Sequence, residues 1–242
     1  MIPGRYLIDV TFNRDNVESF DEYPFNLGAL TNFDKLKLHP KVTYFIGENG
    51  SGKSTLLESM AVAIGFNPEG GTKNFNFETT ETQYELAKYL WFSKTNYFPR
   101  DGFFLRAESF FNVATQIDEL DLKGWYGGKS LHEQSHGESF LTLMTTRFHG
   151  DGIYILDEPE AALSPQRQLA ILSRIHDLVR DSSQFIIATH SPILMAYPDS
   201  TIYECGSDGI REVSYEDTEH YQVTRDFLIN RERMLKILLV DD

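Results

Sequence analysis

The chain has 242 residues, of which 41% are hydrophobic and 24% charged, so it can bury a substantial core and lacks the composition of a disordered protein. Its net charge of −14 disfavours a general attraction to nucleic-acid phosphates, and the single Cys205 excludes an internal disulfide and a multi-cysteine metal site. No stretch approaches about 18 consecutive apolar residues, and the first residues do not form a signal-peptide pattern, so we expect a cytoplasmic protein without a membrane segment.

Apolar runs of strand length recur along the chain. They cover residues 5–12, 41–47, 102–107, 152–158, 184–190 and 200–205. The most apolar of them contain "YFI", "IYIL" and "FIIA", which lack a period-two alternation and therefore predict parallel strands covered on both faces.

Helical patterns lie between these runs, at residues 53–64, 138–148 and 164–180, and the tail 218–239 predicts one or two further helices. Ser164 and Pro165 are start signals for the third helix. The residues expected on its apolar face are Leu169, Leu172, Ile175, Leu178 and Val179. Alternating strands and helices predict an α/β fold. We expect a single domain over 1–242, with a core lobe at about 1–80 and 150–242 and an inserted helical lobe at about 81–149.

A glycine-rich segment follows the second strand run and precedes a helix. It matches the phosphate-loop pattern G-x-x-x-x-G-K-[ST], and it consists of Gly47, Glu48, Asn49, Gly50, Ser51, Gly52, Lys53 and Ser54, with Thr55 next in the helix. Its backbone N–H groups would surround an anion, Lys53 would reach the β- and γ-phosphates, and the Ser54 hydroxyl would bind Mg²⁺. The structural alternative is a plain glycine-rich turn.

Polar side chains end two of the later strands. Asp157 and Glu158 follow a buried strand, where the first acid would hold Mg²⁺ and the second would polarise the attacking water. His190 ends the next buried strand and could contact the γ-phosphate, because ligands bind at the carboxyl ends of parallel strands. The alternatives are a solvated acid pair and a structural histidine.

The order of these motifs resembles the ATP-binding-cassette superfamily of ATPases, whose members have a phosphate-loop core with a largely parallel sheet, N-terminal antiparallel strands and a helical subdomain. That family carries a signature segment at the start of a helix in this subdomain. Here "QSHGE" matches it at Ser135, Gly137 and Glu138, and "EAALSP" matches the following dimer-facing loop around Ala162.

The resemblance implies that two ATP molecules are sandwiched between two chains packed head to tail, and that the signature serine and helix end bind the γ-phosphate held by the other chain. A helix N-terminus and a hydroxyl are suitable donors for a phosphate oxygen. Ser135 and Glu138 also fit an ordinary capping box, and both interpretations can hold together.

Two further residues are matched through the resemblance alone. Glu108 occupies the place of a family glutamine that touches Mg²⁺, although it could equally cap a helix. Tyr23 lies where the family places an aromatic residue against adenine, although it could equally belong to a packed turn. The signature with Glu138 resembles soluble members, such as the SMC and RecF-type ATPases and predicted ATPases linked to phage exclusion, more than transporter subunits.

Three functions remain open from the sequence. The first is Mg²⁺-dependent ATP hydrolysis through a nucleotide-sandwiched homodimer that drives a partner process, with DNA-related work or phage defence as examples. The second is a nucleotide-gated interaction module with slow hydrolysis and a protein partner. The third is the ATPase subunit of a transporter. Nucleic-acid binding is left undecided.

Overall fold

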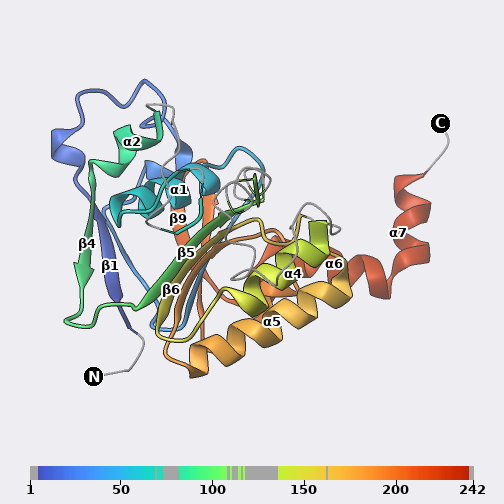
Figure 1. Ribbon diagram of the computed structural model, residues 1–242. Helices are drawn as coiled ribbons and strands as arrows, with labels where there is room; N and C mark the ends of the chain where they lie inside the picture. The colour runs from blue at the N-terminus through green and yellow to red at the C-terminus, as the bar shows by residue number, and fades with distance from the viewer. Residues whose placement is uncertain are drawn as a thin grey trace.

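The computed structural model describes residues 5–68, 70–72, 82–107, 110, 114–115, 117, 136–161 and 163–239. Within this part of the chain two sheets pack on either side of a central helix, with further helices on the far face of the larger sheet (Figure 1). The predicted α/β fold with a largely parallel sheet and N-terminal antiparallel strands is confirmed.

The larger sheet has six strands among the described residues, in the order β5-β6-β7-β3-β8-β9. All of the pairs are parallel except β8–β9, which is antiparallel. The strand bounds are β3 Val42–Ile46, β5 Asp101–Arg106, β6 Gly152–Asp157, β7 Gln184–Ala188, β8 Thr201–Gly206 and β9 Gly209–Val213. The carboxyl ends of the central strands therefore meet at one edge, which is where α/β sheets bind ligands.

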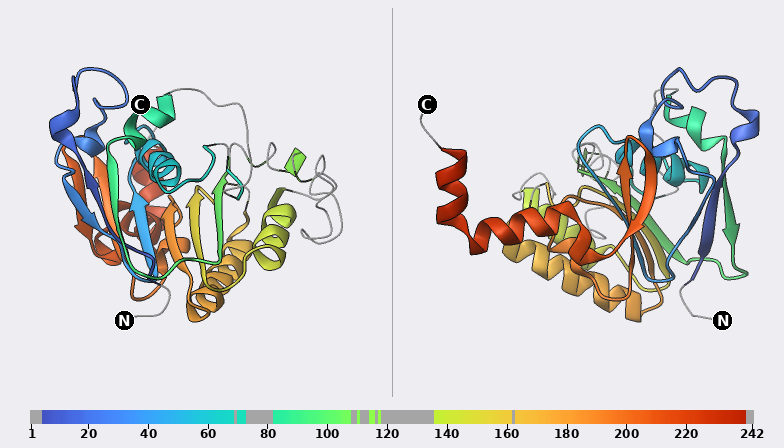
Figure 2. Two further views of the ribbon diagram at one scale, coloured as in Figure 1. Left: turned by 60° about the vertical axis from the view of Figure 1, so that its left-hand side comes forward. Right: turned by 180° about the vertical axis from the view of Figure 1, so that it is seen from behind.

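Both faces of this sheet are buried, as the uninterrupted apolar runs predicted. Alternate residues of β3 and β6 enter two separate cores: Tyr44 and Tyr154 pack on one side, and Phe45 and Ile155 on the other. The first core lies under α4 (His136–Thr146) and α5 (Pro165–Arg180), and the second under α1 (Lys53–Ala63). Figure 2 shows these helices on opposite faces.

The smaller sheet is antiparallel and covers the outer side of α1. Its strands are β1 (Leu7–Phe12), β2 (Lys35–Lys37) and β4 (Leu90–Lys94), in the order β2-β1-β4, and the short helix α2 (Thr82–Ala87) precedes β4. Leu7, Val10 and Phe12 point into the core shared with α1. The smaller sheet thus forms the outermost layer on this side of the molecule, and it holds α1, and with it the loop before α1, in place.

The chain ends in two helices, α6 (Glu219–Ile229) and α7 (Arg231–Leu238), as the tail pattern predicted. Neither helix contains a buried residue, and together they extend away from the sheets as an arm (Figures 1 and 2). No helix in the described ranges combines the length and the apolar character that crossing a bilayer requires.

The predicted apolar face of α5 is wrong at one position. Leu169 is 57% exposed, whereas Ile171, which was not predicted, is fully buried with Ile175 and Leu178. Leu172 and Val179 pack only partly against this core. The helix meets the sheet along the narrow 171–175–178 row, so the broader stripe inferred from the pattern extended too far around the helix.

The start signals of α5 are confirmed, because the Ser164 hydroxyl accepts a hydrogen bond from the Arg167 N–H and Pro165 is the first helical residue. The expected helical lobe at 81–149 also supplies strands to both sheets, namely β4 and β5. Much of that range lies outside the described residues, and the division into two lobes stays a prediction.

Candidate nucleotide and metal site

The loop 47–54 connects β3 to α1, and its glycines adopt backbone conformations that other residues avoid. Gly47, Gly50 and Gly52 have φ values of 139°, 80° and 91°. A Cβ atom on Gly47 would lie 2.3 Å from the carbonyl oxygen of Cys205 in β8, so only glycine fits between the loop and that strand. The loop leads directly into the N-terminal end of α1, whose backbone N–H groups favour an anion.

Lys53, the first residue of α1, is held in the centre of the loop. Its Nζ donates a hydrogen bond to the carbonyl oxygen of Glu48 at 2.9 Å, and the side chain is only 4% exposed. Burial lowers the pKa of Lys53, although the nearby Glu158 and Asp157 carboxylates act against this shift. A buried lysine ammonium beside backbone N–H groups is a suitable partner for phosphate oxygens.

Ser54 and Asp157 come together although 103 positions separate them in the sequence. The Ser54 hydroxyl donates to Asp157 Oδ1 at 3.1 Å, and Asp157 is the last residue of β6. Arg106, at the end of the neighbouring β5, lies 3.9 Å from Asp157 Oδ2 and also pairs with the buried Glu58 of α1. This arginine offsets the negative charge of two acids that are nearly inaccessible to water.

The Ser54–Asp157 pair offers oxygen ligands of the kind that Mg²⁺ prefers. No group of three or more His, Cys, Asp or Glu side chains suited to a metal occurs among the described residues. Mg²⁺ at nucleotide sites does not require one, because it is usually held by one or two protein oxygens together with phosphates and water. The donor set therefore fits Mg²⁺ bound together with a nucleotide.

Glu158 and His190 face each other beside this pair, because β6 and β7 are neighbours and end at the same edge. Glu158 Oε1 lies 3.4 Å from His190 Nε2. Glu158 has a φ of 50°, an uncommon conformation for a non-glycine residue, and its N–H donates to the carbonyl of Ala188 at 2.9 Å. Burial and the nearby Lys53 charge lower the pKa of His190, which favours the neutral imidazole.

The sequence reasoning missed two side chains of this cluster. Glu160 Oε1 accepts a hydrogen bond from the backbone N–H of His190 at 2.5 Å, and burial raises the pKa of this carboxyl group. His220, from the first turn of α6, places its Nε2 atom 3.2 Å from Nδ1 of His190. Glu160 could have been suspected from its place in the turn after the acid pair, whereas no sequence pattern indicated His220.

The predicted signature segment is described only in part. Ser135, Glu108 and Ala162 lie outside the described residues. Gly137 is buried near the start of α4, and the Glu138 carboxylate forms an ion pair with Arg167 of α5 at 3.2 Å. Their contact with a partner's nucleotide stays a prediction.

Tyr23 lies close to the phosphate loop. Its hydroxyl is 3.0 Å from Oγ1 of Thr55, and its side chain is about half exposed. This position is compatible with either interpretation, the adenine contact or the packed turn.

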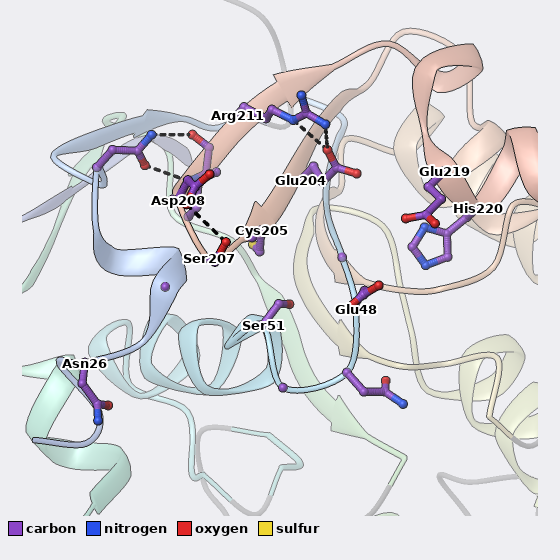
Figure 3. A pocket seen from close by; sticks show the side chains of 18 residues that line it. Asn26, Glu48, Ser51, Glu204, Cys205, Ser207, Asp208, Arg211, Glu219 and His220 are labelled. Carbon is purple, nitrogen blue, oxygen red and sulfur yellow. Dashed lines mark hydrogen bonds and ion pairs between the residues drawn. The ribbon is translucent and has the colours of Figure 1, made fainter.

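Two hollows border the outer side of the phosphate loop. A cavity of about 1050 Å³ lies between the loop, the β8–β9 turn and the start of α6, and Figure 3 shows Glu48 and Ser51 on one side of it and Glu219 and His220 on another. A smaller hollow of about 540 Å³ is lined by Glu48, Asn49, His190 and His220, among others. The larger volume reaches the upper end of the usual size of ligand sites.

Comparisons with known proteins match parts of this chain to families and relatives. The family model described as "AAA domain" matches residues 15–115, and the model described as "AAA domain, putative AbiEii toxin, Type IV TA system" matches residues 129–196. Among curated proteins, the chain is 25% identical over 171 residues to "ABC transporter G family member STR2" of Medicago truncatula. That match covers 62% of this chain and 24% of the plant protein, so the chain spans about a quarter of that relative.

Solved structures show the same fold. A putative metal-chelate type ABC transporter in an inward-facing conformation matches 91% of this chain and 88% of its own, with 15% identity and a TM-score of 0.50. The cbiO1 protein of Clostridium perfringens, part of the transporter complex cbiONQ, matches 98% of this chain and 100% of its own, with 16% identity and a TM-score of 0.51. At these identities the likeness concerns the fold alone, so the resemblance to the soluble branch stays a prediction.

A phosphate loop between a parallel strand and a helix, with acids at the end of a neighbouring strand, defines a phosphate-loop nucleoside triphosphatase. The chain thus has the fold of ATP-binding-cassette structures, and two family models of AAA domains match parts of it.

Proposed function

We propose that this chain hydrolyses ATP in a Mg²⁺-dependent reaction and that two copies enclose the nucleotides head to tail. The observation that carries the proposal is the convergence of Ser54, Asp157, Glu158 and His190 on the loop that holds Lys53. These side chains come from a helix start and two adjacent strand ends, and they supply each part that phosphoryl transfer requires.

Each residue has a distinct role in this proposal. Lys53 and the backbone N–H groups of the loop stabilise the phosphate charge, and Ser54 and Asp157 would hold Mg²⁺. The bound metal supplies further neutralisation of that charge. Glu158 accepts a hydrogen bond from the attacking water and orients it, and His190 donates from Nε2 to the terminal phosphate.

The homodimer rests on the signature segment and on the position of α4. This helix begins at His136, so its positive end follows Ser135 directly in the chain. One chain lines the nucleotide pocket only with its phosphate loop and strand ends. A second copy that presents this helix end to the terminal phosphate would complete the pocket. Hydrolysis removes the phosphate that both copies share, and the dimer then weakens.

The test replaces the Glu158 carboxylate by an amide of equal size. Glu158→Gln should bind ATP with Mg²⁺, lose about 10²- to 10⁴-fold in turnover, and accumulate as a dimer during gel filtration. Glu212→Gln, the same change at an exposed position of β9, is the matched control and should behave as the wild type. Adding Ser135→Arg to Glu158→Gln should abolish the dimer, and chelation of Mg²⁺ should abolish turnover. A Glu158→Gln protein that stays monomeric with ATP and turns over normally would refute the proposal.

A second candidate, a nucleotide-gated interaction module, is favoured by the arm formed by α6 and α7. The arm exposes five large apolar side chains, namely Val223, Leu228, Ile229, Ile237 and Leu238, and its first turn touches His190 through His220. In this case basal hydrolysis is slow and a partner protein accelerates it. A tenfold or larger rise in turnover upon addition of cell extract, but not of nucleic acid, would favour this function (about 1.4 kcal/mol in the barrier).

A further inference from the structure

His190 has two neighbours that constrain the position of its proton. On one side the Glu158 carboxylate, which only accepts hydrogen bonds, lies 3.4 Å from Nε2. On the other side Nε2 of His220 lies 3.2 Å from Nδ1. A neutral imidazole carries its proton on one nitrogen only, so the two contacts cannot be satisfied independently.

One assignment satisfies both contacts. If His220 donates from Nε2–H, then Nδ1 of His190 is the acceptor and the His190 proton must be on Nε2, where it faces Glu158. The reverse assignment would place the proton of His190 on Nδ1 and direct the bare Nε2 lone pair at the carboxylate, which is electrostatically unfavourable. Burial lowers the pKa of both rings, which favours two neutral histidines over a cationic pair.

The structure also fixes where His220 lies. Thr218 is fully buried and caps α6, because its hydroxyl accepts a hydrogen bond from the Tyr221 N–H at 3.3 Å. Tyr215, in the short turn before the cap, donates from its hydroxyl to the carbonyl of Pro192 at 2.8 Å. The start of α6 is thereby joined to the loop that follows His190, and the two rings are held in fixed relation.

We propose that His220 is a positioning residue, which fixes His190 in the tautomer with its proton on Nε2 so that this N–H faces the place of the terminal phosphate. The consequence for catalysis rests on the proposed function, whereas the tautomer itself does not. The two rings line the same hollow as Glu48 and Asn49 of the phosphate loop.

The experiment compares two substitutions of His220. His220→Phe removes the donor, whereas His220→Gln retains it, since a glutamine amide nitrogen can take the place of Nε2. His176→Phe is the matched control, because His176 forms a similar contact elsewhere, with the Tyr197 hydroxyl at 3.2 Å from its Nδ1 atom. Circular dichroism establishes that each variant is folded. Nitrogen-15 NMR reports the tautomer of His190, whose signals are identified by their loss in His190→Asn.

The wild type and His220→Gln should show the proton of His190 on Nε2, and His220→Phe should show a mixture of tautomers. In ATP hydrolysis, His220→Phe should lower kcat by about 10- to 100-fold with little change in KM, and His220→Gln should restore most of it. A wild-type His190 protonated on Nδ1, or an unchanged tautomer in His220→Phe, would overturn the inference. If the wild type hydrolyses no ATP, the proposed function fails, and the NMR spectra still decide the tautomer.

Discussion

Gln184 of the larger sheet forms four hydrogen bonds, to the start of β1 and to the loop after β2, and its replacement by leucine tests how much they contribute to stability. The side chain is fully buried at the start of β7. Its Oε1 accepts from the N–H groups of Tyr6 and Leu7 at 3.0 and 2.9 Å, and its Nε2 donates to the carbonyls of Leu7 and His39, both at 2.9 Å. With each bond contributing about 0.5–1.5 kcal/mol, Gln184→Leu should cost about 2–6 kcal/mol of unfolding free energy.

Urea unfolding followed by far-UV circular dichroism measures this cost. The dependence of the unfolding free energy on urea concentration should be unchanged if the folded and unfolded states keep their compactness. Gln222→Leu, the same substitution at an exposed position of α6, is the control and should change the free energy by less than about 0.5 kcal/mol. If Gln184→Leu lowers the free energy of unfolding by less than about 1 kcal/mol, the four hydrogen bonds do not contribute as expected. Water or a local shift would then satisfy the backbone groups that Gln184 contacts.

Two other predictions concern ATP binding at the phosphate loop and the stability of the fold at low pH. Gly47→Ala should abolish ATP binding, measured by calorimetry, because the added Cβ would lie 2.3 Å from the Cys205 carbonyl at a φ of 139°; binding within threefold of the wild type would contradict this. Burial alone would raise the pKa of Asp101, but hydrogen bonds, first among them that from the Tyr154 hydroxyl, hold it below the usual value. Ionised Asp101 therefore stabilises the folded state above its unfolded pKa of about 4, and this stabilisation is lost as the pH falls through its folded pKa. Asp101→Asn should make the thermal midpoint less dependent on pH below about 4, and an unchanged dependence would contradict the assignment.

The central sheet could be predicted because burial on both faces leaves a strong trace in the sequence. Each of the six apolar runs becomes a strand. Three of these strands are flanked by helices whose start signals or glycines can also be recognised in the sequence. The strands β2, β4 and β9 were not predicted. β2 consists of Lys35, Leu36 and Lys37, with one buried side chain, and such a short segment becomes a strand only because β1 provides its partner.

The site was predictable where one motif or one strand end specifies it. The phosphate loop carries its own context, and the ends of adjacent parallel strands meet at one edge, so Asp157, Glu158 and His190 could be expected near Lys53. The exact pairing depends on strand order. β6 and β7 are neighbours while β3 lies beyond β7, and this order, which the runs alone do not reveal, places Glu158 against His190.

His220 shows why a contact from a distant helix could not be predicted. Helix α6 has no buried residue, so it is positioned by its first turn and not by an apolar face. That position depends on the buried cap Thr218 and on the bond from Tyr215 to Pro192, which are single contacts without periodicity. These contacts hold the start of α6, and with it His220, against the loop that follows His190.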